Sequence, residues 1–178
     1  MTFRTVERAI PWEGQLMPDT NPEKTKAYIA GFLDGDGCVM YQLIRRKDYR
    51  YGFEIRASIV FYQKSQNEKH LERLKDLLKA GYLRKRKDGM TEYAIVGLKP
   101  VIKILKLLEP YCKLKKEHIR TAKRINKLLE REFNLKRFIK ASELVDRFQF
   151  LNYSKKRKNT AKTLKDYLKR HKLYPRND

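Results

Sequence analysis

Cysteine and histidine are scarce in this sequence. The 178 residues hold two cysteines, Cys38 and Cys112, in no metal-binding spacing, and three scattered histidines, His70, His118 and His171. Secreted scaffolds need several paired cysteines and zinc sites need close Cys/His clusters, so the sequence favours neither class. We expect both cysteines to pack as small apolar residues in a reducing compartment, and the histidines to lie at the surface.

Long apolar runs are also missing. No stretch of 18 apolar residues occurs, residues 1–12 contain no apolar segment of a signal peptide, and the mean hydropathy is −0.75. A membrane-spanning helix needs about 20 apolar residues, and a secretory signal needs an apolar segment after a basic start. We therefore expect an intracellular, non-secreted protein, in the cytoplasm of a prokaryote or inside an organelle, with no membrane partner.

Acidic residues are few relative to basic ones. The sequence has 21 Asp and Glu against 43 Lys and Arg, which gives a net charge of +22. A thermophile-like surface would carry Lys and Glu in better balance. An excess of this size predicts a polyanionic partner, with nucleic acid ahead of an anionic membrane surface.

Hydrophobic periodicity predicts an α+β protein with one domain, residues 21–178, after an irregular arm over residues 1–20. Period-two patterns predict two hairpins, 39–44 with 53–61 and 82–86 with 91–96. Helical spacing predicts helices over 23–33, 67–80, 100–108, 115–131, 136–151 and 160–169. The resulting order is αββαββα, followed by further helices.

The first predicted helix has a favourable start and an unfavourable end. Thr20 or Asn21 can cap it, and Pro22 suits its first turn. Asp34 and Asp36 lie at its C-terminal end, where the helix dipole disfavours an acid by about 0.3–1 kcal/mol. A bound cation is the candidate that would compensate for this placement.

The same helix has a face without large side chains. Ala27, Gly31 and Gly35 recur at i, i+4 and i+8, although glycine inside a helix costs about 1 kcal/mol relative to alanine. We predict that this face is a dimer interface, on which a second copy packs in parallel. Two copies of Asp36 and several unpaired carbonyl groups would then meet, and such hard oxygen ligands suit Mg²⁺.

Residues 29–37, IAGFLDGDG, resemble the nine-position signature of the LAGLIDADG homing endonucleases. The resemblance extends from about Thr25 to Leu168 and includes the segments 61–66, 110–116 and 151–158. Because the signature occurs once, the chain is similar to the short homodimeric members of the family. The resemblance implies an αββαββα core with a curved antiparallel DNA-binding sheet, followed by C-terminal helices.

The resemblance also implies roles for single residues. Asp36 would be the metal-binding carboxylate, with the carbonyl group of Gly35 as a neighbouring ligand. Gln63 and Lys115 would organise the water molecules that deliver hydroxide and support the leaving group. Asp34 would support the turn and the interface rather than bind metal. The expected cofactor is Mg²⁺, with Mn²⁺ able to substitute, Ca²⁺ bound without supporting cleavage, and no small-molecule cofactor.

One segment departs from the family pattern. Close relatives often place a further basic residue just after the glutamine segment, where this chain has Asn67 and Glu68. Lys64 or Lys69 would have to take its place.

A twisted antiparallel sheet can present one face to the major groove of DNA. The side chains expected on the solvated face of the strands are Gln42, Arg46, Glu54, Arg56, Ser58, Arg84, Arg86 and Glu92. Arginine suits guanine and glutamine suits adenine, so these positions predict base readout. The candidates for phosphate contacts are Lys64, Ser154, Lys155 and Lys158, three of them in or beside the basic run 155–158.

The function predicted from these features is that of a site-specific, intron-encoded homing endonuclease. It would act as a homodimer and make a double-strand break in a long pseudo-palindromic DNA target by metal-dependent phosphodiester hydrolysis. The alternative is a non-cleaving intron-splicing maturase, or a nucleic-acid-binding regulator, of the same fold. Such a binder could lose Asp36, Gln63 or Lys115, and all three are present.

Two further nuclease interpretations are disfavoured. The pattern Asp48…Glu54-Ile55-Arg56 has arginine where the acid-x-lysine motif of another nuclease class needs lysine. A nuclease embedded in a self-splicing protein is not expected, because the sequence shows no His-Asn splice terminus.

Overall fold

The computed structural model describes residues 21–49, 51–130, 132–153 and 157–175, so the predicted arm over residues 1–20 lies outside the described residues. The elements in chain order are α1 (Pro22–Gly35), β1 (Gly37–Arg45), β2 (Phe53–Lys64), a 3-10 turn (Ser65–Asn67), α2 (Glu68–Leu78), β3 (Tyr82–Lys85), β4 (Met90–Val96), α3 (Leu98–Leu108), α4 (Lys116–Leu129), α5 (Leu135–Asp146), α6 (Phe148–Leu151) and α7 (Ala161–Arg170). This order confirms the α+β fold and the predicted αββαββα core followed by further helices.

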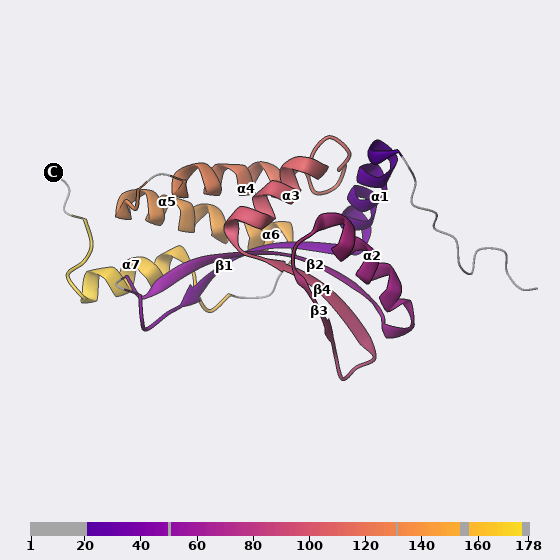
Figure 1. Ribbon diagram of the computed structural model, residues 1–178. Helices are drawn as coiled ribbons and strands as arrows, with labels where there is room; N and C mark the ends of the chain where they lie inside the picture. Colours follow the sequence, from indigo (N-terminus) through magenta and orange to yellow (C-terminus); the bar gives the residue numbers. More distant parts are fainter. Residues whose placement is uncertain (1–20, 50, 131, 154–156, 176–178) are drawn as a thin grey trace, which may run out of the picture.

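The four strands form one antiparallel sheet in the order β1-β2-β4-β3. In β1, Val39, Tyr41 and Leu43 are buried while Gln42 between them is exposed, because successive side chains point to opposite faces of a sheet. Helices α3, α4 and α5 lie over the buried face, and both hairpins bend away from these helices, so the sheet is curved (Figure 1).

The hydrophobic core fills the space between the sheet and the helical layer. Its largest fully buried side chains come from strands and helices alike, and include Tyr41, Phe61, Tyr93, Leu105 and Phe148. The hydroxyl group of Tyr41 accepts a hydrogen bond of 2.7 Å from the amide of Asn126 on α4. Burial raises the pKa of Tyr41 to about 12, so this phenol stays neutral at physiological pH.

Strand β1 is an edge strand, and its outer edge is covered by side chains. Asn152 donates a hydrogen bond of 2.9 Å to the carbonyl oxygen of Val39. Arg157 donates to the carbonyl oxygens of Tyr41 at 3.1 Å and Val145 at 2.9 Å. An uncovered edge is a template for pairing with another chain, so these two side chains close that edge at two positions.

Two predicted helix boundaries were wrong. The helix expected over 136–151 is divided into α5 and α6, because the chain turns after Asp146 to insert Phe148, whose ring stacks on Tyr41 at a centroid distance of 5.0 Å. Helix α3 begins at Leu98, so Pro100 lies within its first turn rather than at its start. A missing N–H group costs nothing in the first turn, because these groups have no partner inside the helix.

Three predictions of solvent exposure were also wrong. Ser58 and Glu92 are buried on the face of the sheet that carries Gln42. Ser58 lies between its cross-strand neighbours Met40 and Val96, and Arg84 covers the carboxylate of Glu92. His118 is 5% exposed and faces the core.

The cysteine prediction is confirmed for packing. Both cysteines are free; Cys112 is buried and Cys38 is half-buried. Within the part of the chain that the structure describes, no helix is long and apolar enough to cross a membrane.

Candidate active site and DNA interface

Helix α1 begins and ends as its sequence indicates. The side chain of Asn21 caps it by accepting a hydrogen bond of 3.0 Å from the N–H group of Glu23, and Pro22 is in its first turn. At the other end Asp36 is the C-cap residue, and its N–H group donates to the carbonyl oxygen of Phe32 at 3.0 Å. Gly35 and Asp36 are both exposed, so their oxygens remain accessible at the end of the helix.

One row of residues along α1 is small and open to solvent, with Lys24 and Tyr28 exposed beside it. Ala27, Gly31 and Gly35 are exposed, and a Cβ atom added to Gly31 or Gly35 would meet nothing within 4 Å. Gly37 differs, because a Cβ there would lie 2.6–2.8 Å from atoms of Leu33. The chain itself therefore requires glycine at the turn into β1 but gives no reason for glycine at Gly31 or Gly35.

Asp34 joins the end of α1 to the start of α4. Its side chain is 9% exposed and accepts three hydrogen bonds from backbone N–H groups, of Lys113 at 2.5 Å, Leu114 at 3.0 Å and Lys115 at 3.0 Å. Burial acts to raise the pKa of Asp34, but these hydrogen bonds outweigh it and lower the pKa. The ionised carboxylate thus fixes the backbone of Lys115 beside the turn that carries Asp36.

The three candidate catalytic residues come to the same end of the sheet. Lys115 is the N-cap residue of α4. Burial raises the pKa of Cys38 on β1, and the positive charge of Lys115 acts on the same thiol in the opposite direction. Gly37, the first residue of β1, pairs with Phe61 on β2, and Gln63 lies two residues further along β2. Gln63 is half-buried and accepts a hydrogen bond of 3.3 Å from Asn67.

The sequence did not predict a buried hydrogen bond near Lys115, between His118 and Asn152. His118, in the first turn of α4, forms a hydrogen bond of 3.0 Å through Nε2 with the side-chain oxygen of Asn152, and Asn152 in turn donates a hydrogen bond to β1. Burial lowers the pKa of His118, with a further lowering from the charge of Lys115 and a partial opposite effect of Asn152. The polar types of these two residues were visible in the sequence, but nothing local paired them.

The face of the sheet that points away from the helices carries paired charges. Gln42 lies opposite Arg56. The ion pairs on and beside this face are Arg46–Asp48 at 2.9 Å, Arg46–Glu54 at 3.5 Å, Arg56–Glu54 at 3.2 Å, Arg84–Glu92 at 2.7 Å and Arg86–Asp88 at 2.9 Å. The acids hold the arginines in defined positions while most of the guanidinium groups stay open to solvent.

The predicted phosphate contacts are only partly within the described residues. Lys64 and Lys158 are exposed, and so is Lys69. Ser154 and Lys155 lie outside the described residues. Arg157 is turned inward to the backbone of β1 and α5, so the basic run 155–158 does not act as four equivalent phosphate contacts.

The end of α1 carries oxygen donors that are open to solvent. The described part of the chain contains no group of three or more His, Cys, Asp and Glu residues that could hold a metal ion. The exposed carboxylate of Asp36 and the carbonyl group of Gly35 are hard oxygen donors, which fit Mg²⁺ or Ca²⁺ and not a soft metal. Their position beside the bare face of α1 means that a second copy could supply the other half of a metal site.

Comparison with known proteins places the chain among nucleases. The model of the family described as LAGLIDADG endonuclease matches residues 29–127. The chain is 32% identical over 144 residues to the DNA endonuclease I-CvuI of Chlorella vulgaris, covering 81% of this chain and 89% of that protein. It is 31% identical over 142 residues to the DNA endonuclease I-CreI of Chlamydomonas reinhardtii, covering 79% of this chain and 86% of that protein.

Solved structures agree with the sequence relatives. The fold is similar to that of I-CvuI in complex with its target in the presence of Ca, with a TM-score of 0.82, 30% identity and coverage of 86% of this chain and 98% of that chain. An archaeal intron-encoded homing endonuclease, I-Vdi141I, complexed with DNA, shares the fold at 17% identity, with a TM-score of 0.76 and coverage of 86% of this chain and 100% of that chain.

Proposed function

Because the chain belongs to the LAGLIDADG endonuclease family, we propose that it is a site-specific, intron-encoded homing endonuclease. It makes a double-strand break in a long pseudo-palindromic DNA target. The observation that carries this proposal is the end of α1, where exposed Asp36 and Gly35 lie next to a backbone that Asp34 locks at Lys115.

The working enzyme is a homodimer built on the bare side of α1. Close approach of two parallel helices needs small residues along the contact, and Ala27, Gly31 and Gly35 supply them. The twofold axis then brings the two copies of Asp36 together. A twofold protein meets two half-sites of DNA, which explains a pseudo-palindromic target.

The residues at the end of α1 would hold the metal ion. Asp36 of each copy, with the Gly35 carbonyl groups, would bind Mg²⁺, for which Mn²⁺ can substitute, whereas Ca²⁺ binds without supporting cleavage. When bound, the metal polarises the phosphate and lowers the pKa of a coordinated water molecule. Nothing else in the reaction requires a small-molecule cofactor.

The side chains around the scissile phosphate position water and charge. Lys115 carries a positive charge that stabilises negative charge developing on the phosphate or the leaving oxygen. Gln63 both donates and accepts hydrogen bonds, so it can orient the attacking water molecule. Asp34 makes no contact with substrate in this proposal and acts by holding the backbone at Lys115.

The curved sheet reads the DNA. Arg56, Arg84 and Arg86 can each donate two hydrogen bonds to guanine, and Gln42 can pair with adenine. Lys64 and Lys158 contact phosphates, as do Ser154 and Lys155 by the family resemblance. Glu54 and Glu92 act by holding the arginines, since both form ion pairs with them.

A cleavage assay on the reconstructed target tests this function. The genomic segments that flank the coding intron are joined in a plasmid, and the purified protein is added with Mg²⁺, Mn²⁺, Ca²⁺ or EDTA. We expect linear product with Mg²⁺ and Mn²⁺, bound but intact DNA with Ca²⁺, and no product with EDTA. Binding of the joined sequence without cleavage under every metal condition would instead support a non-cleaving binder.

A further inference from the structure

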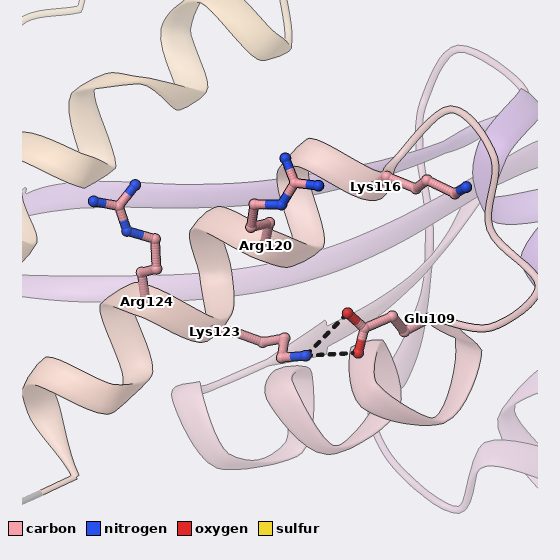
Figure 2. Close-up of a pocket in the computed structure, with 5 residues that line it drawn as sticks. All are labelled: Glu109, Lys116, Arg120, Lys123 and Arg124. Atoms are coloured by element: carbon pink, nitrogen blue, oxygen red, sulfur yellow. Dashed lines mark hydrogen bonds and ion pairs between the residues drawn. The ribbon is translucent and has the colours of Figure 1, made fainter.

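A cationic pocket lies on the helical layer, between the end of α3 and the first turns of α4. It has a volume of about 380 Å³ and is lined by Glu109, Lys116, Arg120, Lys123 and Arg124. Figure 2 shows Lys116, Arg120, Lys123 and Arg124 projecting from one helix, α4, with Glu109 facing Lys123 from the neighbouring segment. Four of these five side chains are cations, so the pocket is built for an anionic ligand.

The pocket opens away from the face of the sheet that we assign to DNA. The side of α4 that carries Ile119, Ala122 and Asn126 is buried, and Asn126 donates to Tyr41 on the helix-covered face of β1. The four cations occupy the opposite, exposed side of α4. A duplex bound to the free face of the sheet would therefore leave the pocket open.

The positive charge of the pocket is not cancelled by its own acids. Lys123 is paired with Glu109 at 2.9 Å, and Arg120 is paired with Glu117. Among the residues that the structure describes, no acid pairs with Lys116 or Arg124. These two cations are free to meet phosphates, and the paired ones line the space between them.

We propose that this pocket binds the phosphodiester backbone of a single-stranded nucleic acid, at the same time as a duplex occupies the sheet. Lys116 and Arg124 are eight residues apart, about 12 Å along the helix, which suits a short length of backbone rather than one phosphate. Because the four cations project from one helix (Figure 2), they offer one line of contacts, which a single backbone can follow. Because none of the lining residues is aromatic, no base is stacked, and binding is independent of sequence.

Fluorescence anisotropy with three labelled probes tests the proposal. The probes are a 20-nucleotide RNA strand, a DNA strand of the same sequence and a 20-base-pair duplex of arbitrary sequence, all in EDTA to prevent cleavage. In Lys116→Gln/Arg124→Gln we expect at least a tenfold loss of affinity for the single strands. The slope of log affinity against log salt should fall by about 1.4, because two phosphate contacts are removed. Affinity for the duplex should change less than twofold.

The chain offers a matched control. Lys162→Gln/Arg170→Gln removes the same two residue types at the same spacing from α7, where both are exposed, and should leave single-strand affinity unchanged. Arg56→Gln/Arg84→Gln on the sheet should weaken the duplex and spare the single strands. The tighter of the RNA and DNA strands identifies the source of the backbone, and either one with this pattern of variants supports the proposal.

Three outcomes would overturn the proposal. They are equal loss in the pocket and control variants, loss of single-strand binding in the sheet variant, and full competition by inorganic phosphate at matched ionic strength. The last would show a site for free phosphate only. Because no cleavage is measured, the result does not depend on the proposed endonuclease activity.

Discussion

Helices α1 and α4 each bury one side in the core and leave the other in solvent, but the two exposed sides are opposite in character. The exposed side of α1 carries a row of small residues, Ala27, Gly31 and Gly35, beside Lys24 and Tyr28, whereas that of α4 carries a row of lysines and arginines. A bare helix side lets another backbone come close. A cationic side repels a second copy of itself and attracts phosphates. The two proposals thus assign self-association to α1 and single-strand contact to α4, two different helices.

The largest effect is expected from Asp36→Asn at the end of α1. The substitution keeps the shape of the side chain and removes the charge proposed to bind metal, so cleavage should fall at least about a hundredfold, since metal stabilisation is worth several kcal/mol. Stability should be equal or higher, because repulsion between the two copies is lost. A plasmid cleavage assay is run beside a gel shift on the same preparation.

The control for this substitution is Asp166→Asn, an exposed acid on α7, which should cleave normally. Near-normal cleavage by Asp36→Asn would show that the acid is structural. Loss of both binding and cleavage would contradict the assignment of Asp36 to metal alone.

Gly31→Leu should prevent the close approach of a second copy to α1. Nothing in the same chain lies within 4 Å of an added Cβ at this position, so the isolated chain should fold and gain roughly 0.5–1 kcal/mol from helix propensity. The dimer should be lost, and cleavage with it, because the leucine side chains of the two copies would fill the space where the two α1 helices are proposed to meet. Sedimentation velocity measures the change in mass, and Gly31→Ala should show a weaker effect in the same direction.

A fully active dimer of Gly31→Leu would show that α1 is not the contact. Self-association would then have to use another surface of the protein.

Asp34→Asn should loosen the joint between the two helices. An amide replaces an ionised acceptor of three backbone hydrogen bonds, and a hydrogen bond to a charged group contributes about 1.5–3 kcal/mol. We expect the free energy of unfolding, measured in urea, to fall by about that amount, and the cleavage rate of the folded protein to fall because Lys115 is no longer fixed.

Asp76→Asn is the control for Asp34, since Asp76 is exposed on α2. Unchanged stability of Asp34→Asn would mean that the backbone over 113–115 holds its position without the carboxylate.

The smallest effect concerns His118 on the buried side of α4. Its pKa is below the ordinary 6.5, so the unfolded chain binds a proton more readily than the folded one. The contribution of neutral His118 to the free energy of unfolding is fully present above about pH 6.5. It is lost as the pH falls toward the pKa of His118 in the folded protein. Asn152, Lys115 and Asp34 act on this ring together with the ring of Phe148.

Between pH 7.5 and pH 5.5 the natural protein should lose up to about 1 kcal/mol more stability than His118→Gln. Urea unfolding at both pH values measures the difference. The exposed His171→Gln is the control. An identical loss in His118→Gln and the natural protein would assign the pH dependence to other groups.

Local patterns were enough to predict most of the fold and the end of α1. The caps at Asn21 and Pro22, the alternation over 53–61 and the glycines at i and i+4 act within one element, so their meaning can be seen without tertiary structure. The family signature added the roles proposed for Asp36, Gln63 and Lys115. The fold and the family are confirmed, whereas these roles and the dimer remain predictions.

Contacts between distant segments could not be predicted in the same way. Asp34 meets backbone groups 79 to 81 residues away, and His118 meets Asn152 across 34 residues. The burial of Ser58 and Glu92 depends on which residues become cross-strand neighbours, and that register follows from the whole sheet. The side chain of Arg157 likewise turns toward the edge of β1, and a run of four basic residues in the sequence does not reveal this.

The anchoring of the segment over 113–115 by Asp34 has a consequence for how this sequence can change over time. The carboxylate holds this segment through main-chain N–H groups, which every residue except proline possesses, and it also interacts with the side chain of Cys112. Lys113 and Leu114 are exposed, so many residue types can replace them without disturbing the hydrogen bonds between Asp34 and the backbone. Related sequences should therefore vary freely at these two positions, exclude proline there, and keep the acid at position 34.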